Sequence, residues 1–156
     1  MKTTSEKNAA VFNDLIRINN DRTEGYRKAA KIIEGKDNGL RDLFEDFANE
    51  SCKNVEELEK YVAHEGEKPA EGTTASGKVY RVWMDFKTTF SGNDRKSILE
   101  ACEYGEDAAQ KAYDSALDAD AEFTAEEKEL IEDQKMSLKE SHNYIKSLRD
   151  RQRVSS

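Results

Sequence analysis

Apolar residues recur at spacings of three and four along four long stretches of the chain. This spacing places them on one face of an α-helix. The four stretches cover about residues 3–35, 39–66, 93–117 and 124–151. Thr3 with Glu6, and Thr124 with Glu127, have the spacing of a capping box, which predicts that helices begin there. Because no stretch alternates apolar and polar residues as a half-buried strand does, the pattern predicts an all-α protein.

A long connection, about residues 66–93, separates the second predicted helix from the third. It begins within the loop EGEKPAEGTTASG and continues as KVYRVWMDFKTTF, whose apolar residues predict a shorter helix over 78–90. The other two connections are short turns, so each pair of long helices should form an antiparallel hairpin. Two hairpins joined by one long crossover is the ferritin-like arrangement among four-helix bundles. We therefore expect residues 1–156 to form a single ferritin-like domain with a short helix in the crossover.

The inward faces of the predicted helices become polar halfway along their length. The most prominent case is Glu106, which interrupts the apolar face of ILEACEYGEDAAQKAY, residues 98–113. At the same level the other helices place Asn19, Arg22, Ser51, Asn54, and either Gln134 or His142. A buried charge without a partner costs several kcal/mol, so this layer requires internal pairing.

We expect Arg22 to pair with Glu106 across the core. The amide and hydroxyl groups of Asn19, Ser51 and Asn54 would then satisfy the remaining hydrogen bonds. Two alternatives stay open. The helix register could leave Glu106 at the rim of the bundle, or Glu106 could belong to a degenerate metal site.

The histidines argue against a standard di-iron centre. A ferritin-like centre takes one Glu from each of two helices and Glu-x-x-His from each of the other two. The chain has two histidines, His64 and His142, and the residues three positions earlier are Tyr61 and Lys139. We therefore expect neither a standard di-iron site nor another cofactor. A degenerate mononuclear site would draw its ligands from Glu106 with Glu24, Glu103 or His142.

Five segments carry a family resemblance, and they occur in the order INNDRTEGYRKAA, LFEDFANES, GKVYRVWMDFK, GNDRKSILEACEYGEDAAQKAY and HNYIKSLRD. The similarity covers about residues 9–150. The chain resembles a bacterial family of ferritin-like four-helix-bundle proteins described as a domain of unknown function. The resemblance implies a ferritin-like bundle and a stress-related role in bacteria, and it implies no established activity.

Composition narrows the choice of partners. Lys and Arg number 25 against 33 Asp and Glu, which gives a net charge of −8 and disfavours a nucleic-acid surface. No apolar run approaches the ~18 residues that span a bilayer, and the N-terminal stretch lacks the apolar core of a secretory signal. We therefore expect a cytoplasmic protein without a membrane partner.

The sequence favours an interaction role over catalysis. We find no Gly-rich phosphate loop, Ser-His-Asp set or zinc motif, so no catalytic residue is assigned. Trp83 and Phe86 of the crossover would offer an oligomer interface if exposed, and we expect a homo-oligomer, with a dimer as the first choice. The leading hypothesis is a non-catalytic structural or interaction protein. The rivals are a metal-binding or redox protein with a degenerate site, and a carrier of a small ligand in the polar layer.

Overall fold

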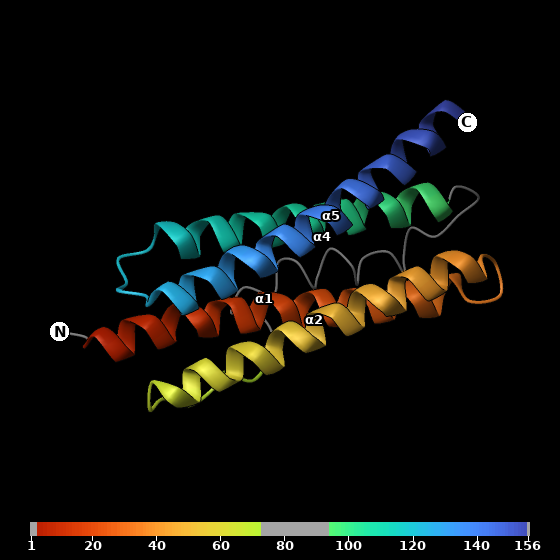
Figure 1. The fold of residues 1–156 in the computed structure, drawn as a ribbon. Helices are drawn as coiled ribbons and strands as arrows, with labels where there is room; N and C mark the ends of the chain where they lie inside the picture. The colour runs from red at the N-terminus through yellow and green to blue at the C-terminus, as the bar shows by residue number, and fades with distance from the viewer. Residues whose placement is uncertain (1–2, 73–93, 156) are drawn as a thin grey trace.

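Four α-helices make up most of the part of the chain that the structure, a computed structural model, describes: residues 3–72 and 94–155 (Figure 1). They are α1 (Thr4–Ile33), α2 (Asn38–His64), α4 (Asp94–Asp118) and α5 (Ala125–Ser155). The expected all-α class is confirmed, and each helix begins and ends within a few residues of its predicted range. The helix expected over 78–90 lies outside the described residues.

The helices form two antiparallel hairpins that pack into one bundle. Short turns join α1 to α2 and α4 to α5, and α4 starts at the end of the bundle where α1 finishes (Figure 1). An ion pair between Arg95 and Asp37 joins the first turn of α4 to the α1–α2 turn. The end of α2 and the start of α4 therefore lie at opposite ends of the bundle, as the predicted long crossover requires.

Two asparagines of α1 hold the first part of that connection. The Asn13 side chain donates to the carbonyl of Lys68 at 3.2 Å and accepts from the backbone N–H of Ala70 at 2.7 Å. Asn20, two turns further along α1, donates to the carbonyl of Gly72 at 2.8 Å. Residues 68–72 therefore run along α1, toward the end where α4 begins.

Local sequence explains where the helices start and stop. Thr3 accepts a hydrogen bond from the backbone N–H of Glu6 at 3.1 Å, which caps α1. Thr124 and Glu127 form the reciprocal capping box at the start of α5, with distances of 3.1 and 2.8 Å. Gly66 has φ +77° just after α2, a conformation that other residues adopt with strain.

The core follows the predicted inward faces. All the residues predicted inward on α1 are buried: Phe12, Leu15, Ile16, Asn19, Arg22, Tyr26, Ala30 and Ile33. The same holds for the face of α4 that contains Glu106: Leu99, Cys102, Glu106, Ala109 and Tyr113. Each large apolar side chain buried in this way stabilises the fold by about 1.5–3 kcal/mol, before the entropy of ordering is subtracted.

Candidate functional site

The Arg22 side chain lies in the middle of the bundle and is 1% exposed. Its Nε donates to Glu106 Oε1 at 2.5 Å and its Nη2 donates to Glu106 Oε2 at 3.0 Å. This is the two-pronged geometry in which a guanidinium and a carboxylate interact most strongly. Glu106 is itself 1% exposed, so the structure places it in the core and not at the rim.

The remaining guanidinium nitrogen of Arg22 contacts α2. Nη1 donates to the Phe47 carbonyl at 2.9 Å and to Ser51 Oγ at 2.8 Å, and it lies 3.0 Å from Glu50 Oε1. The guanidinium carbon also lies 5.0 Å from the ring centroid of Tyr26 and 5.5 Å from that of Phe47. Aromatic rings at this distance attract a cation through their negative faces.

Glu50 also belongs to the cluster, although it was not among the residues predicted for the polar layer. Its side chain is 27% exposed, but its carboxylate faces Arg22. The same carboxylate accepts hydrogen bonds from two serines of α5, Ser137 at 2.8 Å and Ser141 at 3.1 Å. Glu50 therefore joins α2 to both α1 and α5.

These contacts set the protonation states of Arg22 and Tyr26. Burial works to lower the pKa of the Arg22 guanidinium, but the charge and hydrogen bonds of Glu106 outweigh burial and raise it. Burial raises the pKa of the neighbouring Tyr26 phenol well above its usual range, and the Glu106 carboxylate raises it further. Arg22 therefore remains a cation and Tyr26 remains neutral near neutral pH.

A second polar network lies beside the cluster and includes all four helices. Asn19 of α1 donates to the Tyr113 hydroxyl of α4 at 2.9 Å, and that hydroxyl donates to Gln134 Oε1 of α5 at 2.6 Å. Gln134 donates to the carbonyl of Asn54 on α2 at 3.3 Å. Asn54 donates back to Asn19 Oδ1 at 3.2 Å, which closes the ring.

The ring changes the roles expected for two residues. Asn19 and Asn54 were expected to complete the hydrogen bonds of the Arg22–Glu106 pair, whereas they contact each other, and Asn19 contacts Tyr113 while Asn54 contacts Gln134. Of the three polar residues expected to assist the pair, Ser51 contacts Arg22 directly. Burial raises the pKa of Tyr113 despite the opposing hydrogen bond from Asn19, so its hydroxyl keeps the proton that it donates to Gln134.

The other candidate metal ligands have separate partners or face solvent. Glu103 forms an ion pair with Arg149, and His142 Nε2 lies 2.5 Å from Asp107 Oδ1. Glu24 is exposed on α1. Within residues 3–72 and 94–155, no three His, Cys, Asp or Glu side chains come together as a metal-binding group.

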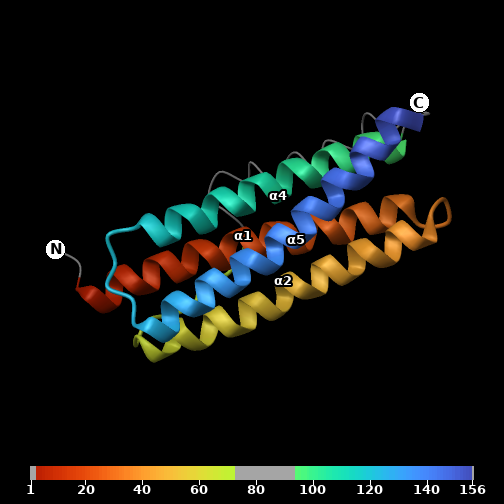
Figure 2. The ribbon, with the colours of Figure 1, turned by 45° about the horizontal axis from the view of Figure 1, so that its top comes forward.

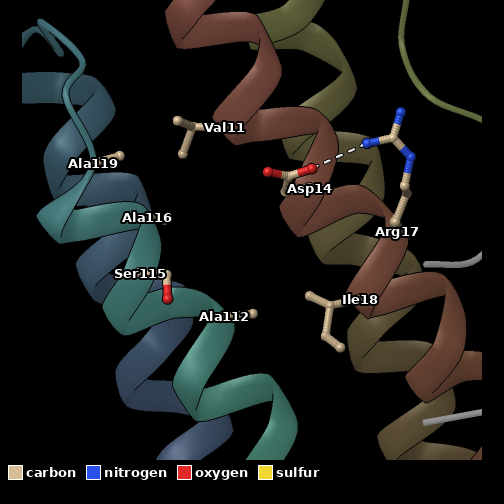
Figure 3. A pocket seen from close by; sticks show the side chains of 8 residues that line it. All are labelled: Val11, Asp14, Arg17, Ile18, Ala112, Ser115, Ala116 and Ala119. Atoms are coloured by element: carbon tan, nitrogen blue, oxygen red, sulfur yellow. Dashed lines mark hydrogen bonds and ion pairs between the residues drawn. The ribbon is translucent and has the colours of Figure 1, made fainter. Parts of the chain in front are cut away.

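A cavity of about 350 Å³ lies between α1 and α4 (Figure 3). Its lining residues on α1 all precede Arg22, so the cavity is closer to the start of α1 than the ion cluster is. Its apolar lining comes from Val11, Ile18, Ala112, Ala116 and Ala119. At its edge Asp14 and Arg17 pair with each other at 3.1 Å. Ligand sites need converging polar groups to orient what they bind, and this lining supplies few.

Comparison with protein families gives a match to one family model. The model described as "Domain of unknown function (DUF2383)" matches residues 7–119. The chain belongs to this family. A comparison with curated proteins found no match.

The DUF2383 match contains most of the polar layer. Arg22, Glu50 and Glu106 all lie within it, as does Tyr113, whereas Gln134 of α5 lies beyond its end. None of the helices described in this DUF2383 chain combines the length and the apolar character needed to cross a membrane.

Proposed function

We propose that this DUF2383 protein is a ferritin-like bundle with a non-catalytic structural or interaction role. In this proposal an arginine-centred ion cluster takes the place of a metal pair. The observation that supports it is the buried Arg22 guanidinium, which lies within hydrogen-bonding distance of two carboxylates, Glu106 and Glu50. Those carboxylates come from two different helices, as the single glutamates of a di-iron centre do.

The residues around this position do not fit a di-iron centre. Two divalent cations need several anionic oxygens together with two imidazoles. Here, apart from the Glu50 carboxylate, α2 contributes Ser51 and Asn54, and α5 contributes Gln134 and Ser137, all four of which are neutral. The fixed positive charge of Arg22 would also repel an incoming cation.

One observation favours the rival function, metal binding at a degenerate site. Glu50 and Glu106 direct their carboxylates at the same point in the core, and carboxylates are good ligands for hard divalent cations. The two functions differ in whether a metal ion can displace the guanidinium. Purified protein can therefore distinguish them.

We predict that the protein shows no saturable binding of Fe²⁺ in anaerobic calorimetry and no ferroxidase signal when air is admitted. Glu106→Gln, which should leave that result unchanged, and the exposed-site control Glu24→Gln would be titrated in parallel. Saturable iron oxidation by the wild-type protein, lost in Glu106→Gln and kept in Glu24→Gln, would establish the metal-binding function and refute our proposal.

A further inference from the structure

A groove opens between α2 and α5 at one end of the bundle. The two views show α5 starting beside the end of α2 and then moving away from it toward the start of α4 (Figures 1 and 2). The space left between the first half of α2 and the last part of α5 has a volume of about 470 Å³. Leu43 of α2 and Tyr144 and Leu148 of α5 supply much of its apolar lining.

The face of α5 beside this groove exposes more apolar surface than the core requires. Tyr144 is 50% exposed and Met136, two turns earlier, is 67% exposed. Residues eight apart on a helix differ in direction by about 80°, so these two side chains lie within one broad outward sector of α5, with Tyr144 at its groove side. Large apolar side chains gathered on one outward face are typical of a protein–protein contact.

The charges on the same face are arranged to complement a copy of themselves. Glu140 lies between Met136 and Tyr144, and Arg151 lies eleven residues, close to three full turns, beyond Glu140. Arg151 donates to Ser147 Oγ at 3.2 Å, which orients its guanidinium along this face. The acidic group therefore precedes Tyr144 along α5, and the basic group follows it.

We propose that this face binds a second copy of the chain, with the two α5 helices antiparallel about a two-fold axis. In a two-fold contact residue i meets residue j and j meets i, so Glu140 of each copy faces Arg151 of the other. The axis then passes near the midpoint of these two residues, where Tyr144 of each copy packs against Leu148 of the other, at the mouth of the groove. This surface differs from Trp83 and Phe86, which lie outside the described residues.

Sedimentation velocity of the full chain tests the proposal. The wild-type protein should be dimeric at about 100 µM, and Tyr144→Glu should weaken the dimer at least about tenfold, as the loss of a central aromatic contact does. Tyr104→Glu is the matched control, because Tyr104 is 43% exposed on the outward side of α4. Circular dichroism would verify that both variants keep the helical fold.

Charge reversal tests the orientation of the two copies. Glu140→Arg alone and Arg151→Glu alone should each weaken the dimer, because like charges then meet twice across the axis. The double variant restores opposite charges and should recover most of the lost affinity. A monomeric wild-type protein, equal effects of Tyr144→Glu and Tyr104→Glu, or a double variant no better than the single ones would overturn the proposal. The result is independent of the iron titration, since these residues lie outside the polar layer.

Discussion

At the scale of single residues, the Arg22–Glu106 contact decides whether the centre of the bundle can be polar. Both side chains are almost completely buried, so Glu106 depends on Arg22 for its electrostatic compensation, and Arg22 depends on Glu106 together with Glu50. Such a pair is not in itself a large source of stability, because desolvation of the two charges offsets much of their attraction. Removal of only one of the two charges nevertheless lowers the stability of the fold, because the remaining charge stays buried.

We predict that Arg22→Met and Glu106→Leu each destabilise the protein by about 3–5 kcal/mol, whereas the double variant loses far less than the sum. Urea unfolding of the four proteins gives the coupling free energy through a double-mutant cycle. Glu50 remains in the double variant, but it is partly exposed and keeps its hydrogen bonds to Ser137 and Ser141. Mild and additive single effects would show that the two charges are not coupled.

At the scale of helical elements, the end of α2 meets the start of α5 through two carboxyl groups. Burial raises the pKa of Glu127, and the Glu65 carboxylate also raises it. Burial works to raise the pKa of Glu65 as well, but its hydrogen bonds to Glu127, Ser5 and Asn8 outweigh burial and lower it. Because a raised folded-state pKa favours the protonated form, the contribution of Glu127 to stability is largest in acid and is lost as pH rises through its folded-state pKa. Because the pKa of Glu65 is lowered, its contribution to stability is present at higher pH and is lost as pH falls through its folded-state pKa.

We predict that Glu127→Gln becomes more stable relative to the wild-type protein as pH rises from about 4 to 7. Glutamine keeps the oxygen that caps the Thr124 N–H, and its amide can donate to Glu65 as a protonated Glu127 does. Glu6→Gln, the same substitution at the exposed cap of α1, is the control. Thermal unfolding across the pH series measures both. A difference for Glu127→Gln that does not depend on pH would contradict this account.

The helical periodicity predicted both the helices and the Arg22–Glu106 pair, because it identifies residues at the middle of an inward face. Arg22 and Glu106 lie in the middle of long inward faces, where small errors of helix rotation leave them in the core. Glu50 lies at the margin of the inward face of α2. Whether a marginal residue faces solvent or a neighbouring helix depends on the rotation and separation of the two helices. The periodicity of either helix alone does not determine these two quantities.

The same limit applies between α4 and α5. His142 contacts Asp107, and Glu103 forms an ion pair with Arg149, so two residues considered as metal ligands have partners across the helix interface. Periodicity indicates which face of a helix His142 and Glu103 lie on. It does not give the distance between the two helices, which decides which side chain each residue contacts. The closed ring through Tyr113 was missed for another reason. The periodicity argument counted Tyr113 only as an apolar residue of the inward face and did not consider the hydrogen bonds of its hydroxyl.

At the scale of the whole molecule, α5 completes both polar networks, although the DUF2383 match ends before it. Gln134 closes the ring, and Ser137 and Ser141 bind the Glu50 carboxylate. Its apolar face adds Ile131, Leu138 and Ile145 to the core. Helices α1, α2 and α4 therefore contain most of the charged cluster and lack the surface that covers it.

We predict that a chain ending at residue 120 does not unfold cooperatively, because it leaves this core surface and the hydrogen-bonding groups of Asn54 and Tyr113 facing water. A chain ending at Arg151 keeps the buried residues of α5 and should unfold as the full chain does. Urea denaturation followed by circular dichroism compares the two. A sharp transition at the full-chain midpoint in the shorter protein would show that the matched region folds alone.

The two-pronged contact between Arg22 and Glu106 also constrains how the sequence can diverge among relatives. Substitutions arise one at a time, and natural proteins are stable by only about 5–15 kcal/mol, so an ancestor with one unmatched charge would lose a large part of its margin. Evolutionary paths that pass through such an ancestor should therefore be rare. Members of the DUF2383 family should therefore either retain both charges or replace both, while the exposed Glu24 varies independently of its neighbours.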